Sequence, residues 1–284
     1  MGTRTEVSSP GGRVARKWLV ELKVVGKSAD TLKLYGAVVR QWLSWLGPRC
    51  FKRATRTHVI KFLEHLRKSV EQSTCKTYLN ALRAFYRWLE IEGIVRQSAP
   101  AKVKVQCDEK LPVPPPTEDI AALFAVARNP LEEALPRGLF ATGCRVSELM
   151  GLRIERIDLK AREAVVMGKG RRERVVYFTR ETAKVWKRLI DHRTTGFLFE
   201  WRGRAMAADA AYRRLERLSE RAHIRNINPH ALRHAYATQL LRRRANLREV
   251  QELLGHKSIL STQRYTHIAR PRLREVYERS YPRA

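Results

Sequence analysis

The chain has 284 residues, a length that fits two domains, each able to bury its own core. Lysine and arginine number 57 against 28 aspartate and glutamate, so the formal net charge is +29. With 44% hydrophobic residues and no run of about 18 apolar ones, the sequence excludes a low-complexity chain and predicts no membrane contact. A charge surplus of this size favours a polyanionic partner, DNA or RNA, although a solvated basic surface explains composition alone equally well.

The cysteines indicate the compartment. They lie far apart and form no C-x-x-C pair, which argues against a zinc knuckle or a disulfide framework and fits a reducing cytosol. The first ten residues are polar and lack the apolar stretch of a secretory signal. We therefore expect a cytoplasmic, nucleoid-associated protein. The four cysteines are Cys50, Cys75, Cys107 and Cys144.

Before residue 99 the hydrophobic pattern is helical throughout. Apolar side chains recur at i, i+3 and i+4 spacing in four stretches, and Ser28 or Asp30 is expected to cap the second of them. This pattern predicts a small helical bundle over residues 1–98, in which the aromatic stripe of the last helix forms core and not a base-stacking platform. That stripe comprises Tyr78, Leu82, Phe85, Tyr86 and Leu89.

Residues 99–116 are predicted to form an interdomain linker. Four of the five residues from 112 to 116 are proline, which cannot continue a helix and favours extended geometry.

The remaining residues, 117–284, mix helices with strands. Thr117 is a good N-cap, and Pro136 is expected to kink or interrupt the next helix. Residues 153–178 alternate apolar and polar side chains, as two or three short antiparallel strands do. The predicted fold class is therefore mainly α with a small antiparallel β-sheet, a helical bundle followed by an α+β domain.

Several charged or polar residues in this second half occupy helix or turn positions where apolar or small residues are more usual. An arginine follows a glycine break amid apolar neighbours, a histidine and an arginine share a helical face, and a lysine lies between the glycines of a turn. A further histidine ends a helix, and a tyrosine lies in a polar setting. The residues are Arg145, Lys169, His230, Arg233, His256 and Tyr265.

Each of these signals has a structural alternative when taken singly. Arg145 can form a plain ion pair with Glu148, three residues on. His230 and His234 have the i, i+4 spacing of a pair of zinc ligands on a helix. However, no Glu follows His230 directly, and the arginine between the two histidines would repel a cation, so no metal site is expected. Lysine between glycines is most often a surface turn, and Tyr265 can equally be a core aromatic.

Taken together and in this order, the motifs resemble the tyrosine recombinases, and within them the Xer-type site-specific recombinases. The resemblance rests on TGCRVSEL, the GKG turn, HALRHAYAT, LLGH and QRYTH, with LRAFYRWL as a helical core-binding signature. It covers the chain from about residue 13 to its end. It implies a core-binding domain over residues 1–98 and a catalytic domain over 117–284, ending in a tail that packs on a neighbouring protomer.

The resemblance implies a reaction that fits the chemistry of these side chains. Tyr265 is the nucleophile that forms a covalent phosphotyrosine, so that the bond energy is not lost to water. Guanidinium forks bind non-bridging phosphate oxygens best, and Arg145 and Arg233 take that role.

The other residues complete the expected site. His230 is the base candidate for the tyrosine proton, whose ordinary pKa is about 10. Lys169 is the general acid for the leaving 5′-hydroxyl, and His256 donates a hydrogen bond to the phosphate. Glu148 orients Arg145. We expect no cofactor and no metal, because these cationic donors take a metal's place.

The expected partners are a double-stranded DNA recombination site, further copies of the chain or a second recombinase in a tetramer, and a septal DNA translocase. Host dimer resolution and integration or excision of mobile DNA use the same chemistry, and the sequence leaves both open. A type IB topoisomerase-like enzyme and a non-catalytic DNA-binding descendant are further alternatives, and a metal nuclease is the weakest.

Overall fold

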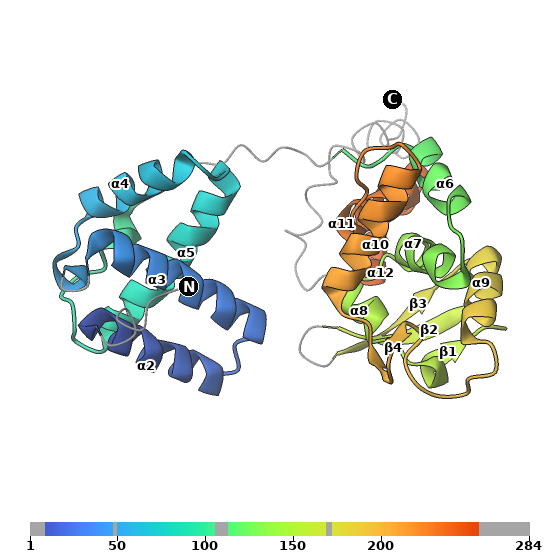
Figure 1. Cartoon of the computed structure of the whole chain (residues 1–284), viewed down its shortest axis with the longest axis horizontal. Coiled ribbons are helices and arrows are strands. Elements are labelled where there is room, and N and C mark those ends of the chain that lie inside the picture. The colour runs from blue at the N-terminus through green and yellow to red at the C-terminus, as the bar shows by residue number, and fades with distance from the viewer. Residues whose placement is uncertain (1–8, 48–49, 106–112, 169–171, 256–284) are drawn as a thin grey trace, which may run out of the picture. The chain divides into compact units, whose positions relative to one another are not determined.

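A computed structural model of the chain describes residues 9–47, 50–105, 113–168 and 172–255 (Figure 1). The chain divides into two compact units, residues 1–110 and 111–284, each with its own hydrophobic core. None of the helices in these described ranges is both long and apolar enough to cross a bilayer.

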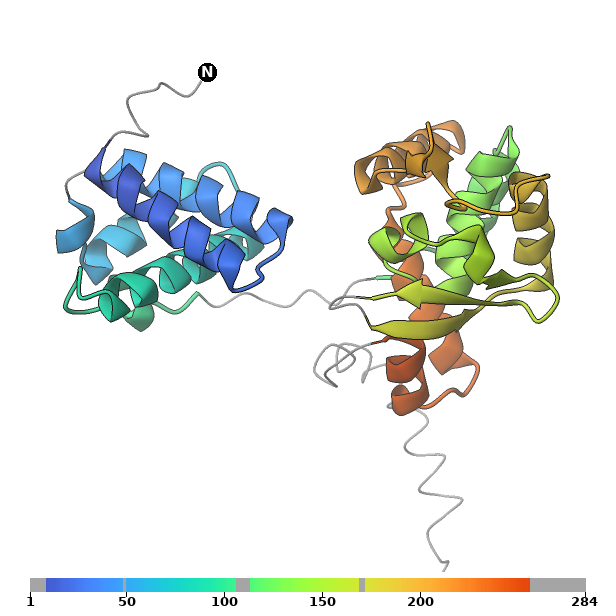
Figure 2. The same cartoon turned by 90° about the horizontal axis from the view of Figure 1, so that it is seen from below.

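The N-terminal unit is built from helices, and Figure 2 shows the first two lying side by side. Ser28 caps α3 by accepting a hydrogen bond from the backbone N–H of Thr31, and Gly47 ends the helix at φ 89°. The helices are α2 (Pro10–Val24), α3 (Ala29–Leu46), α4 (Arg56–Arg67) and α5 (Gln72–Ile91), with short 3-10 turns η1 (Phe51–Arg53) and η2 (Ala99–Lys102).

Aromatic side chains fill the core of this unit. Trp42 packs edge-on against Phe62, and Trp18 packs against Phe85. The Tyr86 hydroxyl accepts a hydrogen bond from Trp42 Nε1 at 3.0 Å and donates one to the Phe51 carbonyl at 2.9 Å. The aromatic stripe of α5 therefore belongs to the core, as the sequence predicts.

The first residues of the expected linker lie against this unit. Turn η2 contacts α4 and α5, and Val103 is buried in the same core. The Arg83 guanidinium donates hydrogen bonds to the carbonyls of Pro100 and Val103. Residues 113–116 belong to neither a helix nor a strand, and Val113 is exposed.

The C-terminal unit combines helices with two small sheets, and Figure 1 shows the strands along one side of the helices. Its helices are α6 (Thr117–Ala125), α7 (Pro130–Thr142), α8 (Val146–Met150), α9 (Arg180–Ile190), α10 (Ala208–Arg221), α11 (Pro229–Arg242) and α12 (Leu247–Leu254), with a 3-10 turn η3 (Ile154–Arg156). Its strands are β1 (Ile157–Asp158), β2 (Glu163–Met167), β3 (Glu173–Tyr177), β4 (Glu200–Trp201) and β5 (Arg204–Ala205).

The larger sheet has the antiparallel order β1-β2-β3, which confirms the strands expected over residues 153–178. In its register Val166 lies opposite Arg174, and Gly168 donates a backbone hydrogen bond to Arg172 across the turn. The β4–β5 hairpin is an addition that lies outside the strands expected over residues 153–178.

Two local expectations were wrong. The interruption expected at Pro136 does not occur, since helix α7 runs through this buried proline, and its packing along α9 and α11 outweighs the loss of one backbone donor. Thr117 is the first helical residue of α6 and Pro116 occupies the cap position. Asn129 caps α7 through its side-chain oxygen.

Candidate active site

A tight turn after α7 begins the site. Gly143 has φ 60°, the left-handed region, and a Cβ there would lie 2.4 Å from the Tyr236 ring, so only glycine fits. The Thr142 hydroxyl donates to the Gly138 carbonyl at 2.6 Å and accepts from the backbone N–H of Cys144 at 3.2 Å. The turn therefore delivers Arg145 to the start of α8 in one fixed orientation.

Arg145 and Glu148 form a close pair. The backbone N–H of Arg145 donates to Glu148 Oε2 at 2.9 Å, and its Nη1 donates to Oε1 at 2.6 Å. The carboxyl side chain is only 2% exposed, whereas that of Arg145 is 40% exposed. The ion-pair alternative is therefore real, but it leaves Arg145 accessible to an anion.

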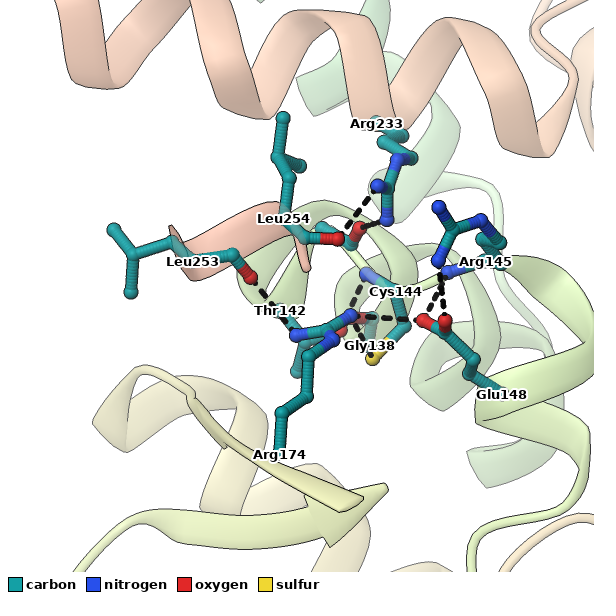
Figure 3. A network of polar contacts seen from close by, with 10 residues as sticks. Gly138, Thr142, Cys144, Arg145, Glu148, Arg174, Arg233, Leu253 and Leu254 are labelled. Carbon is teal, nitrogen blue, oxygen red and sulfur yellow. Dashed lines mark hydrogen bonds and ion pairs between the residues drawn. The ribbon is translucent and has the colours of Figure 1, made fainter. Parts of the chain in front are cut away.

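Arg233 approaches the same place from α11 (Figure 3). The residue is 5% exposed, and its guanidinium donates to the carbonyl of Gly143, 90 residues earlier, and to that of Leu254 at 2.8 Å. Burial and the neighbouring charge of Arg145 lower its pKa to about 10. Arg233 is thus still charged at neutral pH, and a bound phosphate would relieve this repulsion.

A third arginine, Arg174 on β3, was not among the sequence candidates. Its Nη2 donates to Glu148 Oε2 at 2.8 Å, and its Nη1 donates to the Leu253 carbonyl at 2.8 Å (Figure 3). The signal was present in the strand alternation, since Arg174 shares a face with the buried Val176. An arginine on the buried face of a strand requires a carboxylate partner.

The electrostatics of the cluster centre on Glu148. Burial raises the pKa of its carboxyl, but the backbone N–H of Arg145 and the charge of Arg174 outweigh burial and hold the pKa below its ordinary value. One carboxylate therefore neutralises part of a group of three guanidinium ions. The remaining positive charge suits a phosphodiester.

His230 lies on α11, one turn from Arg233, and is exposed. Its ring centroid is 5.3 Å from that of His234, edge to face. Asn228 caps this helix, which fixes where the first turn begins. In the described ranges no three His, Cys, Asp or Glu side chains are grouped to hold a metal ion.

Lys169, His256 and Tyr265 lie outside the described residues. The residues that directly precede Lys169 and His256 are described, and both lie close to the cluster. A Cβ on Gly168, the residue before Lys169, would lie 3.6 Å from Glu148 Oε1. Gly255, the residue before His256, has φ 65°, and a Cβ there would lie 2.7 Å from the Cδ of Arg174.

Comparison with known proteins identifies the family. The phage integrase family model matches residues 118–272, and the model of the phage integrase N-terminal SAM-like domain matches residues 15–93. The chain belongs to the phage integrase family, the tyrosine recombinases. The resemblance and the fold class inferred from the sequence are thereby confirmed.

Individual relatives and solved structures support the same family and fold. Tyrosine recombinase XerD of Pseudomonas aeruginosa is 34% identical over 279 residues, covering 91% of this chain and 93% of that protein. Tyrosine recombinase XerC of Oceanobacillus iheyensis is 38% identical over 227 residues, covering 72% and 73%. The Tn1549 transposon integrase, solved with transposon right-end DNA, shares the fold, with a TM-score of 0.75 at 20% identity over 95% of this chain and 99% of that one.

Proposed function

We propose that this tyrosine recombinase cuts and rejoins double-stranded DNA at a specific site through a covalent 3′-phosphotyrosine at Tyr265. The observation that carries the proposal is the convergence of Arg145 and Arg233 beside one buried carboxylate, Glu148. Two arginines held in this way present a preorganised cationic site for a phosphate, which is where a phosphoryl transfer gathers negative charge. The family supplies the type of reaction.

In the proposed first step the Tyr265 oxygen attacks phosphorus, and the bond from phosphorus to the 5′ oxygen breaks. His230 takes the tyrosine proton, and Lys169 gives a proton to the departing 5′ oxygen. Arg145 and Arg233 hold the non-bridging oxygens.

His256 adds a hydrogen bond to the phosphate, and Glu148 orients Arg145. A 5′-hydroxyl of the partner strand then attacks the phosphotyrosine, and the same proton transfers run in reverse. No proton or charge transfer in this sequence requires a metal or a cofactor.

An arginine-rich surface supports DNA binding by the C-terminal unit. A groove of about 710 Å³ lies between the β4–β5 hairpin and α10. Its wall carries an exposed tryptophan, Trp201, with Arg202 over the ring at 5.8 Å. Such a surface suits phosphate contacts that position the duplex. The arginines that line it are Arg202, Arg204, Arg213 and Arg214.

For the assembly we infer a core-binding domain over residues 1–98, a linker over 99–116 whose first residues, up to Val103, pack on that domain, and a catalytic domain over 117–284. The enzyme then acts as a tetramer on two DNA sites, either of identical chains or with a second recombinase. A pocket of about 340 Å³, with Phe124, Phe140 and Leu240 in its wall, could receive the apolar side chains of the tail over residues 271–280, which in this proposal comes from a neighbouring protomer.

The biological role that fits best is Xer-type resolution of chromosome or plasmid dimers in the cytoplasm, for chromosome partition at cell division, with a septal DNA translocase as a further partner. The XerD and XerC relatives favour it. Integration or excision of mobile DNA is the second candidate, since the transposon integrase shares the fold.

The deciding experiment uses a nicked suicide duplex that carries a site selected by the protein from a random-sequence pool. A covalent protein–DNA band on an SDS gel that survives EDTA and vanishes in Tyr265→Phe, with binding retained, supports the proposal. Tyr177→Phe, an exposed tyrosine of β3, is the matched control and should leave the band intact. Loss of binding together with the band would make Tyr265 structural.

A plasmid assay separates recombination from topoisomerase activity. Relaxation of a plasmid that lacks the selected site would favour the type IB topoisomerase-like alternative. Exchange between two plasmids that both carry the site, with no relaxation without it, supports the recombinase.

A further inference from the structure

Arg174 contacts two parts of the site that are far apart in the chain. Glu148 belongs to α8, 26 residues before Arg174, and Leu253 lies at the end of α12, 79 residues after it. Arg174 also lies within 3.8 Å of the Cys144 sulfur. The strand that carries it begins at Glu173, four residues after Lys169 in the chain.

We propose that Arg174 is a positioning residue of the reaction, which locks the carboxylate of Glu148 and the end of α12 so that Arg145 and the segment that leads to His256 face the same phosphate. This inference rests on the proposed function, because it concerns how the same site is held.

The geometry of the carboxylate is the first argument. Oε1 of Glu148 accepts from Arg145 Nη1, while Oε2 accepts from Arg174 Nη2 and from the Arg145 backbone. With both oxygens engaged, the carboxylate cannot turn to take both guanidinium nitrogens of Arg145. Arg174 therefore limits how tightly Glu148 holds Arg145, and it leaves the remaining donors of Arg145 to the phosphate.

The seating of α12 is the second argument. The Arg174 side chain is 14% exposed, and its Cδ and Nε lie so close to Gly255 that a Cβ there would be 2.7 Å and 2.8 Å away. The helix end thus rests directly on this side chain. A displacement of about 1 Å in such a contact is enough to cost roughly 100-fold in rate when it misplaces a reacting group.

Charge is the third argument. The groups that face Glu148 are the Arg145 and Arg174 guanidinium ions and the backbone N–H of Arg145, with Arg233 and the Cys144 thiol nearby. Since the Glu148 pKa is lowered partly by Arg174, removing that charge raises it. The form of Glu148 that orients Arg145 is then lost at a higher pH than in the unmodified enzyme.

The test is single-turnover formation of the covalent adduct on the nicked suicide duplex with the selected site, measured from acidic to neutral pH at saturating protein. Arg174→Gln should slow the step about 100-fold, with DNA affinity within a few-fold, and move the acid limb of the rate profile to higher pH. Arg174→Lys should restore the acid limb but only part of the rate, because one ammonium cannot bind Glu148 and Leu253 as a fork does.

Arg172→Gln is the control, because it removes one positive charge from the same hairpin at an exposed position. It should change neither the rate of adduct formation nor the pH of the acid limb. In a Glu148→Gln background, replacing Arg174 should move no acid limb, because the titrating carboxyl is gone.

The outcomes are distinguishable. An unmodified enzyme that forms no adduct overturns the proposed function itself. Adduct formation by Arg174→Gln within threefold of Arg172→Gln, or a slower rate with an unmoved acid limb in a protein of native melting temperature, overturns the positioning role alone. A shifted limb that Arg174→Lys restores supports it.

Discussion

The two units of this recombinase bury different chemistry. Among the described residues, the N-terminal core is apolar and aromatic, buries no charged side chain, and pairs its buried polar groups, such as the Tyr86 hydroxyl and the Trp42 N–H, with each other. The C-terminal unit buries Glu148 and Arg233 and nearly buries Arg174. Burying charge costs free energy unless partners are supplied, so the second unit holds its chemistry by an ion-paired network and the first holds its shape by packing.

This contrast predicts that substitutions in the two units affect catalysis and stability differently. A change in the C-terminal network should alter the reaction at least as strongly as the melting temperature. A change in the N-terminal core should alter melting alone, at temperatures where the unit stays folded. The following variants test this division, from the largest expected effect to the smallest.

Arg233→Lys should reduce the single-turnover cleavage rate about 1,000-fold, or roughly 4 kcal/mol in activation free energy, with DNA binding retained. An ammonium cannot donate to the Gly143 and Leu254 carbonyls and also present two donors to a phosphate. Arg188→Lys, an exposed arginine paired with Glu133, is the control and should be near neutral. Near-normal cleavage by Arg233→Lys would refute the phosphate-binding role.

Glu148→Gln should lower the free energy of unfolding by about 3 kcal/mol at neutral pH, because it removes the carboxylate that two guanidinium groups share. The pKa of Glu148 is below its ordinary 4.5 in the folded protein. Its contribution to stability is therefore complete above about pH 4.5 and is lost as the pH falls through the folded pKa.

Chemical unfolding of the unmodified protein and the variant across this range measures the effect. The difference between them should shrink on acidification. A constant difference at all pH values would show that charge is not the cause.

Tyr86→Phe should cost about 1–2 kcal/mol of stability and leave cleavage unchanged. The variant leaves the buried Trp42 N–H and Phe51 carbonyl without the hydroxyl that joins them. The Tyr78 hydroxyl makes an exposed hydrogen bond to Gln41, so Tyr78→Phe is the control and should lower the free energy of unfolding by less. Loss of cleavage well below the melting temperature would contradict the division between the two units.

Arg213→Gln should weaken DNA binding a few-fold and reduce the salt dependence of log K by about one unit, without affecting the cleavage rate at saturation. Arg248→Gln removes an exposed arginine that is paired with Glu252, and it should change the slope less. Titration of binding against salt concentration measures both. Equal slopes for Arg213→Gln and the unmodified protein would place the duplex elsewhere.

Much of the architecture could be read from local signals. The periodicity of α5, the Ser28 cap and the strands around Gly168 follow from short-range rules of helix and hairpin formation. The β4–β5 hairpin was not predicted, because strands of two residues are too short to show a periodic pattern of apolar side chains. The continuity of α7 through Pro136 was not predicted either, because packing along α9 and α11 outweighs the tendency of proline to end a helix.

The sequence by itself determined the fold class, the family and the candidates Arg145, Glu148, His230 and Arg233, because each stands in a short motif whose chemistry is legible residue by residue. Only the tertiary structure decided that Gly143 and Leu254 anchor Arg233 and that Arg174 joins Glu148 to the end of α12. The physical reason is distance along the chain. A carbonyl 90 residues away, or a carboxylate that two arginines share, has no local signature until the fold brings its partners within hydrogen-bonding range.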